Sequence, residues 1–284
     1  MTTLHVAGRG IEIRTGTWAI NVLGPLEARC GGRLVALPPR RRGLLALLAL
    51  RAGSMVTADQ LVDGLWGEDA PPTALRTLHA HIAKLGAALG EVGGERAIRR
   101  LDPGYALAAD AVRVDRDWFE ELATGGLRHS AAGRYAEAAR SFARGLALWR
   151  GPALSGCPVH GWAVAEADYL EGLRLQAYEG LFAARLAAGL RDTTVGEVER
   201  LVAEHPLRER LWELLIVALQ VNGRSGDAHR TYRRARRTLI DELGVEPGEG
   251  LRHVVAGVLR GVADPRPLLR LAPASGHPQS RRAS

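Results

Sequence analysis

Lysine is nearly absent from this chain. Lysine and arginine together number 38, and Lys84 is the single lysine. A phosphate-binding loop of the form GxxxxGK(S/T) needs a lysine, and the residues around Lys84 do not match it, so no nucleotide-hydrolysing module of that class is present. The abundance of arginine, alanine, glycine and leucine is typical of coding bias in a G+C-rich genome.

Cysteine and long apolar runs are also scarce. Cys30 and Cys157 stand alone and far apart, so they match no metal-binding or redox pair and fit a reducing compartment. The longest apolar run, Leu44–Leu50, has seven residues, whereas a helix needs ~20 to span a bilayer. The first residues contain no apolar segment of the signal-peptide type. We therefore expect a cytoplasmic protein with no membrane partner.

Catalytic patterns are missing as well. The sequence has no paired carboxylates, Ser/His/Asp set or metal-ligand spacing that rises above chance. The acidic cluster that begins at Asp115 suits the solvated start of a helix, where acidic side chains are favourable. His79 and His81 project away from each other on a helix, so they cannot share a metal. We expect no enzyme activity, no catalytic residue, no metal and no cofactor.

The residues up to 110 predict strands, three helices and a hairpin, in the order of a winged helix-turn-helix. The predicted strands are 18–24, 26–28 and 33–36, the helices are 40–53, 57–66 and about 73–89, and the hairpin is 97–109. Thr57 and Gln60 form a capping box, in which each side chain satisfies a backbone N–H at the helix start. Residues 1–16 lack periodicity and are expected to be a flexible extension, so the predicted domain is 17–110.

The third of these helices has mostly small side chains on the side opposite its apolar stripe. The predicted stripe is Leu75, Leu78, Ile82, Leu85 and Leu89, and the opposite side is Arg76, Thr77, Ala80, Ala83, Lys84 and Ala87. Small side chains let a helix approach the floor of the DNA major groove. Arg76 and Lys84 can reach phosphates or guanine edges, and Thr77 can meet a thymine methyl group. The alternative is that this alanine-rich side packs on another protein surface.

Other basic residues of this domain are candidates for contact with the DNA backbone, and the net charge of +7 is compatible with such a partner. Arg40, Arg41 and Arg42 fall in the first turn of a helix, where the macrodipole disfavours cations and an external phosphate would offset that cost. Arg99 and Arg100 lie on the first strand of the predicted wing. Ordinary solvation, or protection of a strand edge, is the alternative in each case.

The second half predicts helices alone. The predicted ranges are 115–132, 134–149, 160–188, 194–205, 208–222, 224–243 and 248–260. The stretches 132–142 and 222–232 share a Gly-Arg pair, an alanine five residues after the glycine and an aromatic residue nine after it, and Gly189 and Gly223 are 34 residues apart. That period is typical of tetratricopeptide-like helical hairpins, which present surfaces to protein partners. The predicted helical domain is 111–261.

Two further features of this half are basic. Four arginines of the predicted helix 224–243 share one side, which is either solvated, paired with acids or a docking surface; they are Arg230, Arg233, Arg234 and Arg237. Residues 262–284 are rich in proline, serine and arginine, so we expect a disordered tail.

The chain resembles the Streptomyces antibiotic regulatory proteins over residues 17–261. The resemblance is carried by four strings: "RRRGLLALLALRAG" (40–53), "QLVDGLWGEDAPP" (60–72), "LVAEHPLRERLWELLIVAL" (201–219) and "YRRARRTLIDELGVEPG" (232–248). The resemblance implies a mainly α protein, with an N-terminal OmpR-type winged helix-turn-helix (α+β) and an all-α, tetratricopeptide-like bacterial transcriptional activation domain. Larger relatives carry an added ATPase module, so this chain is similar to a small, stand-alone member.

The resemblance also implies a function: sequence-specific activation of a secondary-metabolite (antibiotic) gene cluster. Members bind direct repeats in double-stranded DNA near promoters as side-by-side protomers, a homodimer on DNA. They recruit RNA polymerase through its sigma subunit and alpha C-terminal domain, here with a contact loop at Gly67, Glu68 and Asp69. The DNA-binding residues that we predict are Arg76, Thr77, His79, Ala80, Lys84, Arg99, Arg100, Arg40 and Arg42.

One stretch departs from the family pattern. Relatives commonly place several basic residues in the C-terminal half of the recognition helix, where this chain has "AKLGAAL" (83–89). We expect fewer direct base contacts here and more reliance on phosphates and DNA shape. The same feature keeps an alternative open, in which the chain is a helical-repeat interaction scaffold with a degenerate winged-helix module.

Overall fold

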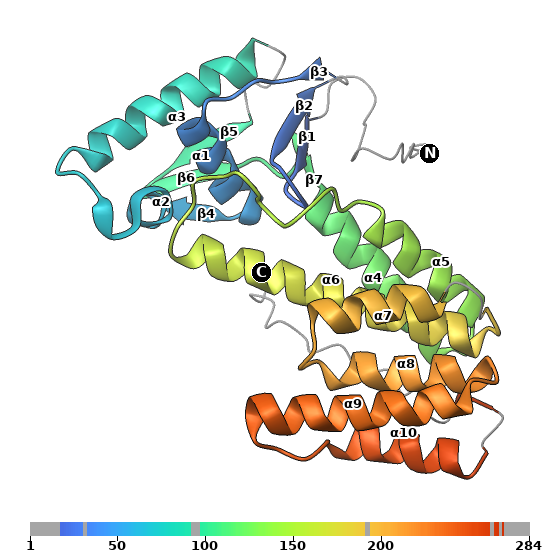
Figure 1. Cartoon of the computed structure of the whole chain (residues 1–284). Helices are drawn as coiled ribbons and strands as arrows, with labels where there is room; N and C mark the ends of the chain where they lie inside the picture. The colour runs from blue at the N-terminus through green and yellow to red at the C-terminus, as the bar shows by residue number, and fades with distance from the viewer. Residues whose placement is uncertain are drawn as a thin grey trace. The chain divides into compact units, whose positions relative to one another are not determined.

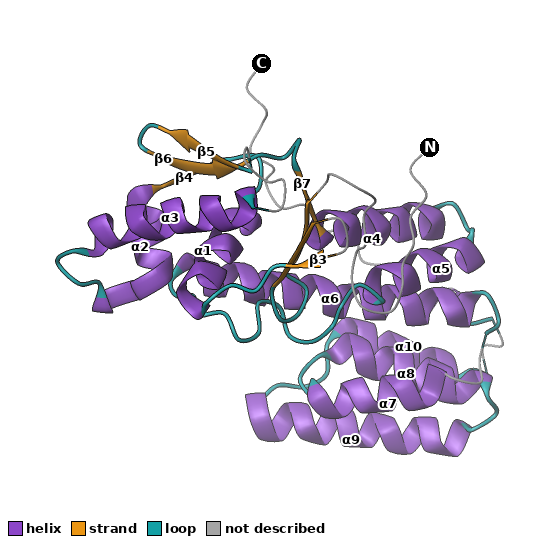
Figure 2. Cartoon of the chain, turned by 90° about the horizontal axis from the view of Figure 1, so that it is seen from above, coloured by secondary structure: helices purple, strands orange, loops and turns teal. Residues whose placement is uncertain are grey.

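The computed structural model describes residues 18–30, 33–91, 97–190, 194–261, 264–266 and 269. The expected extension 1–16 and nearly all of the expected tail 262–284 lie outside these residues. The chain divides into two compact units: Met1–Glu121 with Arg144–Leu175, and Leu122–Ala143 with Gln176–Ser284. Strands occur in the N-terminal part of the described chain, and helices make up the remainder (Figures 1 and 2).

A four-stranded sheet opens the first unit. Its strands, in spatial order, are β3 (Arg33–Leu34), β2 (Glu27–Cys30), β1 (Trp18–Asn21) and β7 (Val112–Val114). The first three are antiparallel, whereas β7 runs parallel to β1 and pairs Val112 with Trp18. The sequence did not predict β7, because three residues carry too little pattern and their partner lies more than 90 residues away.

The winged helix-turn-helix follows in the predicted order. Its elements are α1 (Pro39–Leu50), β4 (Met55–Thr57), α2 (Ala58–Trp66), η1 (Gly67–Asp69), α3 (Ala74–Gly90), β5 (Ile98–Leu101) and β6 (Gly104–Leu107). The capping box is confirmed: the Gln60 amide N–H donates to Thr57 Oγ1 at 3.2 Å, and the Thr57 N–H donates to Gln60 Oε1 at 3.0 Å. The wing gains the unpredicted strand β4, which pairs with β6 in a sheet ordered β4-β6-β5.

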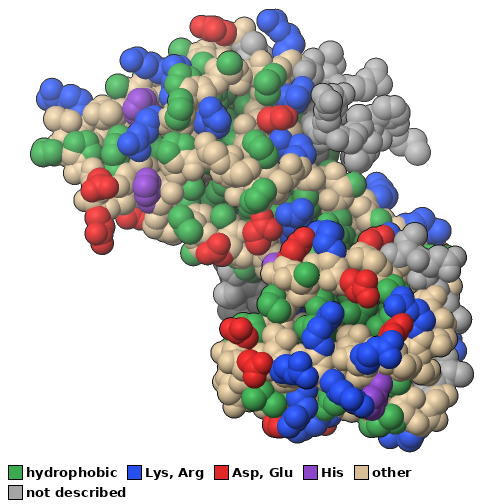
Figure 3. Space-filling view, viewed as in Figure 1, with side chains coloured by type: hydrophobic (Ala, Val, Ile, Leu, Met, Phe, Trp, Pro, Cys, Tyr) green, Lys and Arg blue, Asp and Glu red, His purple; other side chains and the backbone are tan. Residues whose placement is uncertain are grey.

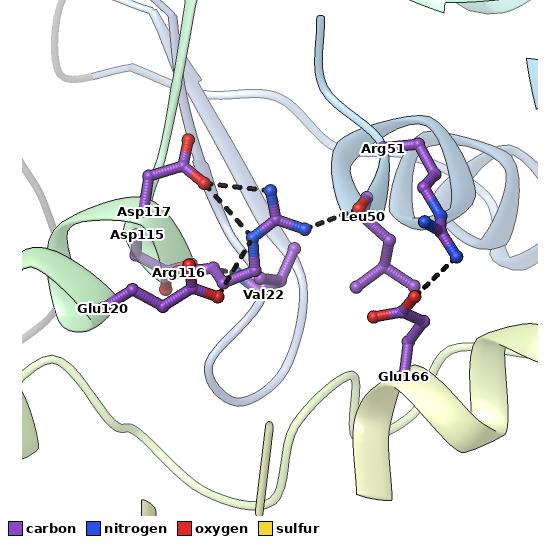
Figure 4. A network of polar contacts seen from close by, with 8 residues as sticks. All are labelled: Val22, Leu50, Arg51, Asp115, Arg116, Asp117, Glu120 and Glu166. Carbon is purple, nitrogen blue, oxygen red and sulfur yellow. Dashed lines mark hydrogen bonds and ion pairs between the residues drawn. The ribbon is translucent and has the colours of Figure 1, made fainter. Parts of the chain in front are cut away.

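The C-terminal end of α1 is tied to the elements that follow the wing (Figure 4). Arg116 donates to the Leu50 carbonyl at 2.5 Å and to Asp117 at 2.9 Å. Arg51 pairs with Glu166 at 2.6 Å. Cations near the carbonyl end of a helix offset its partial negative charge. The Arg51–Glu166 pair links residues 144–175, which follow the wing in the chain, to α1 in the same compact unit.

Asp115 corrects one expectation. We predicted a solvated acidic cluster, but the structure buries Asp115 completely. Its carboxylate accepts the N–H groups of Val22 at 2.7 Å and Leu23 at 3.1 Å, and the Arg150 guanidinium lies 3.9 Å away. Burial raises the pKa of Asp115 to about 7, outweighing these N–H groups and the arginine. Asp115 therefore joins the end of β1 to the first helix after the wing rather than facing water.

The remaining helices match the predicted ranges to within a few residues. They are α4 (Asp115–Ala131), α5 (Tyr135–Leu146), α6 (Trp162–Ala187), α7 (Thr194–Glu204), α8 (Glu209–Val221), α9 (Ser225–Leu243) and α10 (Glu249–Leu259). Gly133, Gly189 and Gly223 each follow a helix with a φ of 71° to 78°. The residue after each glycine donates its N–H to a carbonyl five residues back, at 2.9 Å. This arrangement is the Schellman motif, so the glycine repeat marks equivalent helix ends.

The repeat also fixes packing inside the second unit. Ala138 and Ala228, the equivalent alanines, are both buried, and so is Phe142. The Phe142 ring lies against Gly126 of α4 and Gly180 of α6, where an added Cβ would come within 2.7 Å and 2.6 Å of its Cζ atom. The glycines thus leave room for the ring between the helices.

Candidate nucleic-acid interface

Helix α3 packs against α1 and α2 through one apolar side. Leu78, Ile82, Leu85 and Leu89 are buried, as predicted, and Ala74 joins them. Leu75 does not: 49% of its surface is exposed. It lies at the edge of the stripe in the first turn of the helix, so the smaller Ala74 takes the inward position. The prediction for Leu75 was therefore wrong by one residue.

The outward side of α3 is open. Arg76, Ala80, Ala83, Lys84 and Ala87 are exposed. Thr77 is half-buried at the edge of this side. A surface that is slim, weakly basic and uncovered is the shape that a major groove admits, with cations at its margins for phosphates.

Two histidines flank this side and behave differently. The His79 ring is exposed and meets the Tyr105 ring edge-on, with centroids 6.2 Å apart, so it touches the wing sheet. Burial lowers the pKa of His81, and the positive charges of Lys84, Arg41 and Arg40 lower it further. His81 is therefore uncharged at neutral pH and adds nothing to the positive charge of the surface.

The three arginines at the start of α1 face different neighbours. Arg40 donates to the Leu65 carbonyl at 2.5 Å and lies 5.7 Å from the Trp66 ring centroid. Arg42 acts electrostatically on the Cys157 thiol, whose pKa is raised by burial. Arg41, which we did not include among the predicted DNA contacts, lowers the pKa of His81 electrostatically, as Lys84 does. The α2 carbonyl end thus offsets the charge of Arg40, and we infer that Arg41 belongs to the α3 surface. Sequence alone gave no signal to separate the three.

Of the two arginines predicted on the wing, one pairs with an acid among the described residues and the other does not. Arg99 makes a two-pronged contact with Asp110, at 2.8 Å to each carboxylate oxygen, although both side chains are exposed. Arg100 is exposed, and no acidic side chain among the described residues pairs with it. Arg100 on β5 is therefore the better placed of the two for a phosphate.

The loop after α2 presents Glu68 and Asp69 to solvent in η1, and Gly67 precedes them with a φ of 56°. A segment that sequence analysis did not connect with it lies alongside. The His160 N–H donates to the Gly64 carbonyl at 2.9 Å, and Trp162 Nε1 donates to the Gln60 carbonyl at 3.0 Å. These contacts tie residues 160–162 to α2, and no local sequence pattern predicts them.

Among the described residues there is no group of three His, Cys, Asp or Glu side chains that could hold a metal ion. No helix in that part of the chain is long and apolar enough to cross a membrane.

Comparisons with known proteins agree with this architecture. Residues 114–259 match the family described as "Bacterial transcriptional activator domain", and residues 32–107 match "Transcriptional regulatory protein, C terminal". The chain is 36% identical over 260 residues to transcriptional regulatory protein MoaR1 of Mycobacterium tuberculosis, covering 90% of this chain and 84% of that protein. It is 36% identical over 254 residues to regulatory protein DnrI of Streptomyces peucetius, covering 87% and 93%.

A solved structure is similar as well. Mycobacterium tuberculosis EmbR, in complex with a low-affinity phosphopeptide, superposes with a TM-score of 0.81 at 32% identity. The match covers 86% of this chain and 65% of the EmbR chain, so about a third of that protein has no counterpart in the match. Winged helix, helical repeats and relatives together show that this chain belongs to the Streptomyces antibiotic regulatory protein family of DNA-binding transcriptional regulators.

Proposed function

We propose that this protein activates transcription of a secondary-metabolite gene cluster by binding direct repeats near promoters and recruiting RNA polymerase. Two protomers bind side by side on the duplex, each with α3 in a major groove, and the protein is associated with the nucleoid. The loop Gly67–Asp69 and the helical repeats contact the polymerase, through its sigma subunit and alpha C-terminal domain.

The observation that carries the proposal is the uncovered outward side of α3. Arg76 and Lys84 stand eight residues apart on it, with exposed alanines between them. Two turns of helix separate these cations by about 12 Å, so they can reach phosphates on either side of a groove contact. Few side chains on this surface can hydrogen-bond to bases, so adjacent protomers supply the additional affinity that one protomer lacks.

Replacing Lys84 by alanine tests the phosphate contact. We expect weaker operator binding and a log–log dependence of affinity on salt whose slope is shallower by about one, because one lost phosphate contact releases one fewer counterion. Fluorescence anisotropy over a salt series measures both quantities. Lys84→Arg keeps the charge and should keep the slope; an unchanged slope in Lys84→Ala would mean that Lys84 touches no phosphate.

The arrangement on DNA is tested by footprinting the purified full chain on the region upstream of its own gene, followed by mapping of bound sites across the genome. We expect protected direct repeats, in phase with the helical turn of DNA, next to promoters of a biosynthetic cluster. No shifted or protected DNA at low salt would favour the alternative of a helical scaffold whose winged helix has lost DNA binding.

Polymerase recruitment is tested at the loop after α2. In the double variant Glu68→Ala, Asp69→Ala we expect operator affinity within about twofold of the unmodified protein, because both exposed side chains belong to η1 and not to the outward side of α3. Transcription in a reconstituted assay should fall at least about fivefold, since acidic side chains pair with basic partner surfaces. Unchanged transcription would exclude this loop as a polymerase contact.

A further inference from the structure

A concentrated basic surface lies on α9, in the second unit and outside the winged helix. It consists of Arg230, Arg233, Arg234 and Arg237, here called the arginine face, and all four residues are exposed. Figure 3 shows Lys and Arg side chains gathered over the part of the second unit where Figure 1 places α9. Neighbours three and four residues apart lie on one side of a helix, so the four arginines form adjacent pairs on successive turns.

Only one of the four arginines of the arginine face pairs with an acid among the described residues. Arg230 pairs with Asp227, which also accepts from Arg224 at 2.7 Å. Arg234 lies over the Trp212 ring, 4.9 Å from its centroid, so its position is fixed by packing. Among the described residues, Arg233 and Arg237 pair with no acidic side chain. Like charges at these separations destabilise a helix, and an anionic partner relieves that repulsion.

The composition of the face indicates which kind of anion it fits. Its other exposed positions are Gly226 at one end and Asp241 at the other, so no apolar side chain lies among the arginines. Stable protein interfaces have an apolar or aromatic centre from which charged residues are depleted. A contact with a phosphate backbone needs no such centre, because it consists of cations and hydrogen-bond donors.

The length of the face is suited to a duplex backbone. From Arg230 to Arg237 the helix rises about 10 Å, an axial distance over which each DNA strand carries about three phosphates. In the winged helix, two of the predicted phosphate-contacting cations are engaged within the molecule, since Arg40 donates to Leu65 and Arg99 pairs with Asp110. Phosphate contacts from elsewhere in the chain would add to those of the cations that remain.

We propose that the arginine face of α9 is a second, sequence-independent DNA-binding surface, which contacts the phosphate backbone of duplex DNA. Arg233 and Arg237 provide the contacts, and Trp212 holds Arg234 beside them. The inference goes beyond the proposed function, because it assigns DNA binding to the helical repeats as well as to the winged helix. The two proposals have in common only that the protein binds duplex DNA.

The test measures binding of the full chain to a random-sequence duplex over a salt series. In Arg233→Ala, Arg237→Ala we expect the log–log salt slope to be shallower by about 1.8, since each lost phosphate contact contributes about 0.9. Affinity at ~0.1 M salt should fall at least about tenfold. The control is Arg200→Ala, Arg236→Ala, which removes the same charge from exposed arginines whose partners are Glu204 and Glu246; its slope should change by less than half as much.

Each remaining outcome is decisive. A slope that is the same in the test and control variants overturns the proposal and leaves DNA binding by α3 intact, which Lys84→Ala measures separately on the operator. Failure of the unmodified chain to bind any duplex at low salt would overturn both. Poly-glutamate tests the alternative of an acidic protein partner. That alternative would hold if poly-glutamate bound the unmodified chain more tightly than the duplex does, and if Arg233→Ala, Arg237→Ala weakened poly-glutamate binding but left duplex affinity unchanged.

Discussion

Replacing Ala80 by glutamate is expected to lower operator affinity by at least about 100-fold, equivalent to ~3 kcal/mol. Ala80 is exposed at the centre of the outward side of α3, between Arg76 and Lys84. A carboxylate there would face the phosphates and base edges of the groove, and like charges brought together at an interface cost several kcal/mol. Its side chain would also keep the helix from the groove floor. Gel shift and anisotropy with an operator duplex measure the loss.

Two further variants show whether the loss arises at the interface. Ala136→Glu introduces the same residue at an exposed position of α5, so it reproduces the change in net charge and in side-chain size away from α3. We expect its operator affinity to stay within about threefold of the unmodified protein. Ala80→Gln adds the bulk without the charge and should fall between the two. Operator binding by Ala80→Glu as tight as by Ala136→Glu would remove α3 from the interface.

Replacing Gly104 by alanine is expected to destabilise the first unit by about 3 kcal/mol or more. Gly104 pairs with Thr57 across β6 and β4. A Cβ on Gly104 would lie 2.7 Å from Thr57 Cα and 2.8 Å from the Val56 carbonyl carbon. Both atoms are backbone, so neither can rotate away, and the two strands must separate. Because Thr57 also caps α2, this movement would disturb the helix-turn-helix together with the wing.

Chemical denaturation followed by tryptophan fluorescence measures this effect, since Trp212 is the one tryptophan of six outside the first unit. The matched control is Gly86→Ala in α3. No atom lies within 4 Å of a Cβ at Gly86, and alanine is favoured over glycine in a helix, so this variant should gain about 0.5–1 kcal/mol. A midpoint for Gly104→Ala equal to that of the unmodified protein would show that β4 and β6 are not packed as described.

The two compact units do not coincide with the two sequence families. The family matches meet between residues 107 and 114, whereas Arg144–Leu175 packs with the winged helix in the first unit. Trp162 and His160 hydrogen-bond to carbonyls of α2, and Glu166 pairs with Arg51. A winged helix cut from the chain after residue 110 would lose these partners.

The helices of this protein were predictable because their signals are local. Apolar spacing, the Thr57–Gln60 capping box and the glycines after the helices each act within a few residues, so sequence alone placed every helix from α4 to α10. The outward side of α3 could be predicted for the same reason, since helical geometry fixes which residues share a side. Leu75 was misplaced because an angle on the helix does not say which residue at the edge of the stripe faces inward, and the structure buries Ala74 instead.

Tertiary structure decided what depends on partners far away in the chain. Strand β7 exists because β1 lies beside it, and β4 exists because β6 does. Asp115 is buried because the N–H groups of Val22 and Leu23, more than 90 residues earlier, replace its water. Arg40 and Arg99 are committed to Leu65 and Asp110, which no spacing rule predicts. Sequence determines the hydrogen bonds that a helix makes with itself, whereas folding selects among the many distant groups that could satisfy a strand edge or a charge.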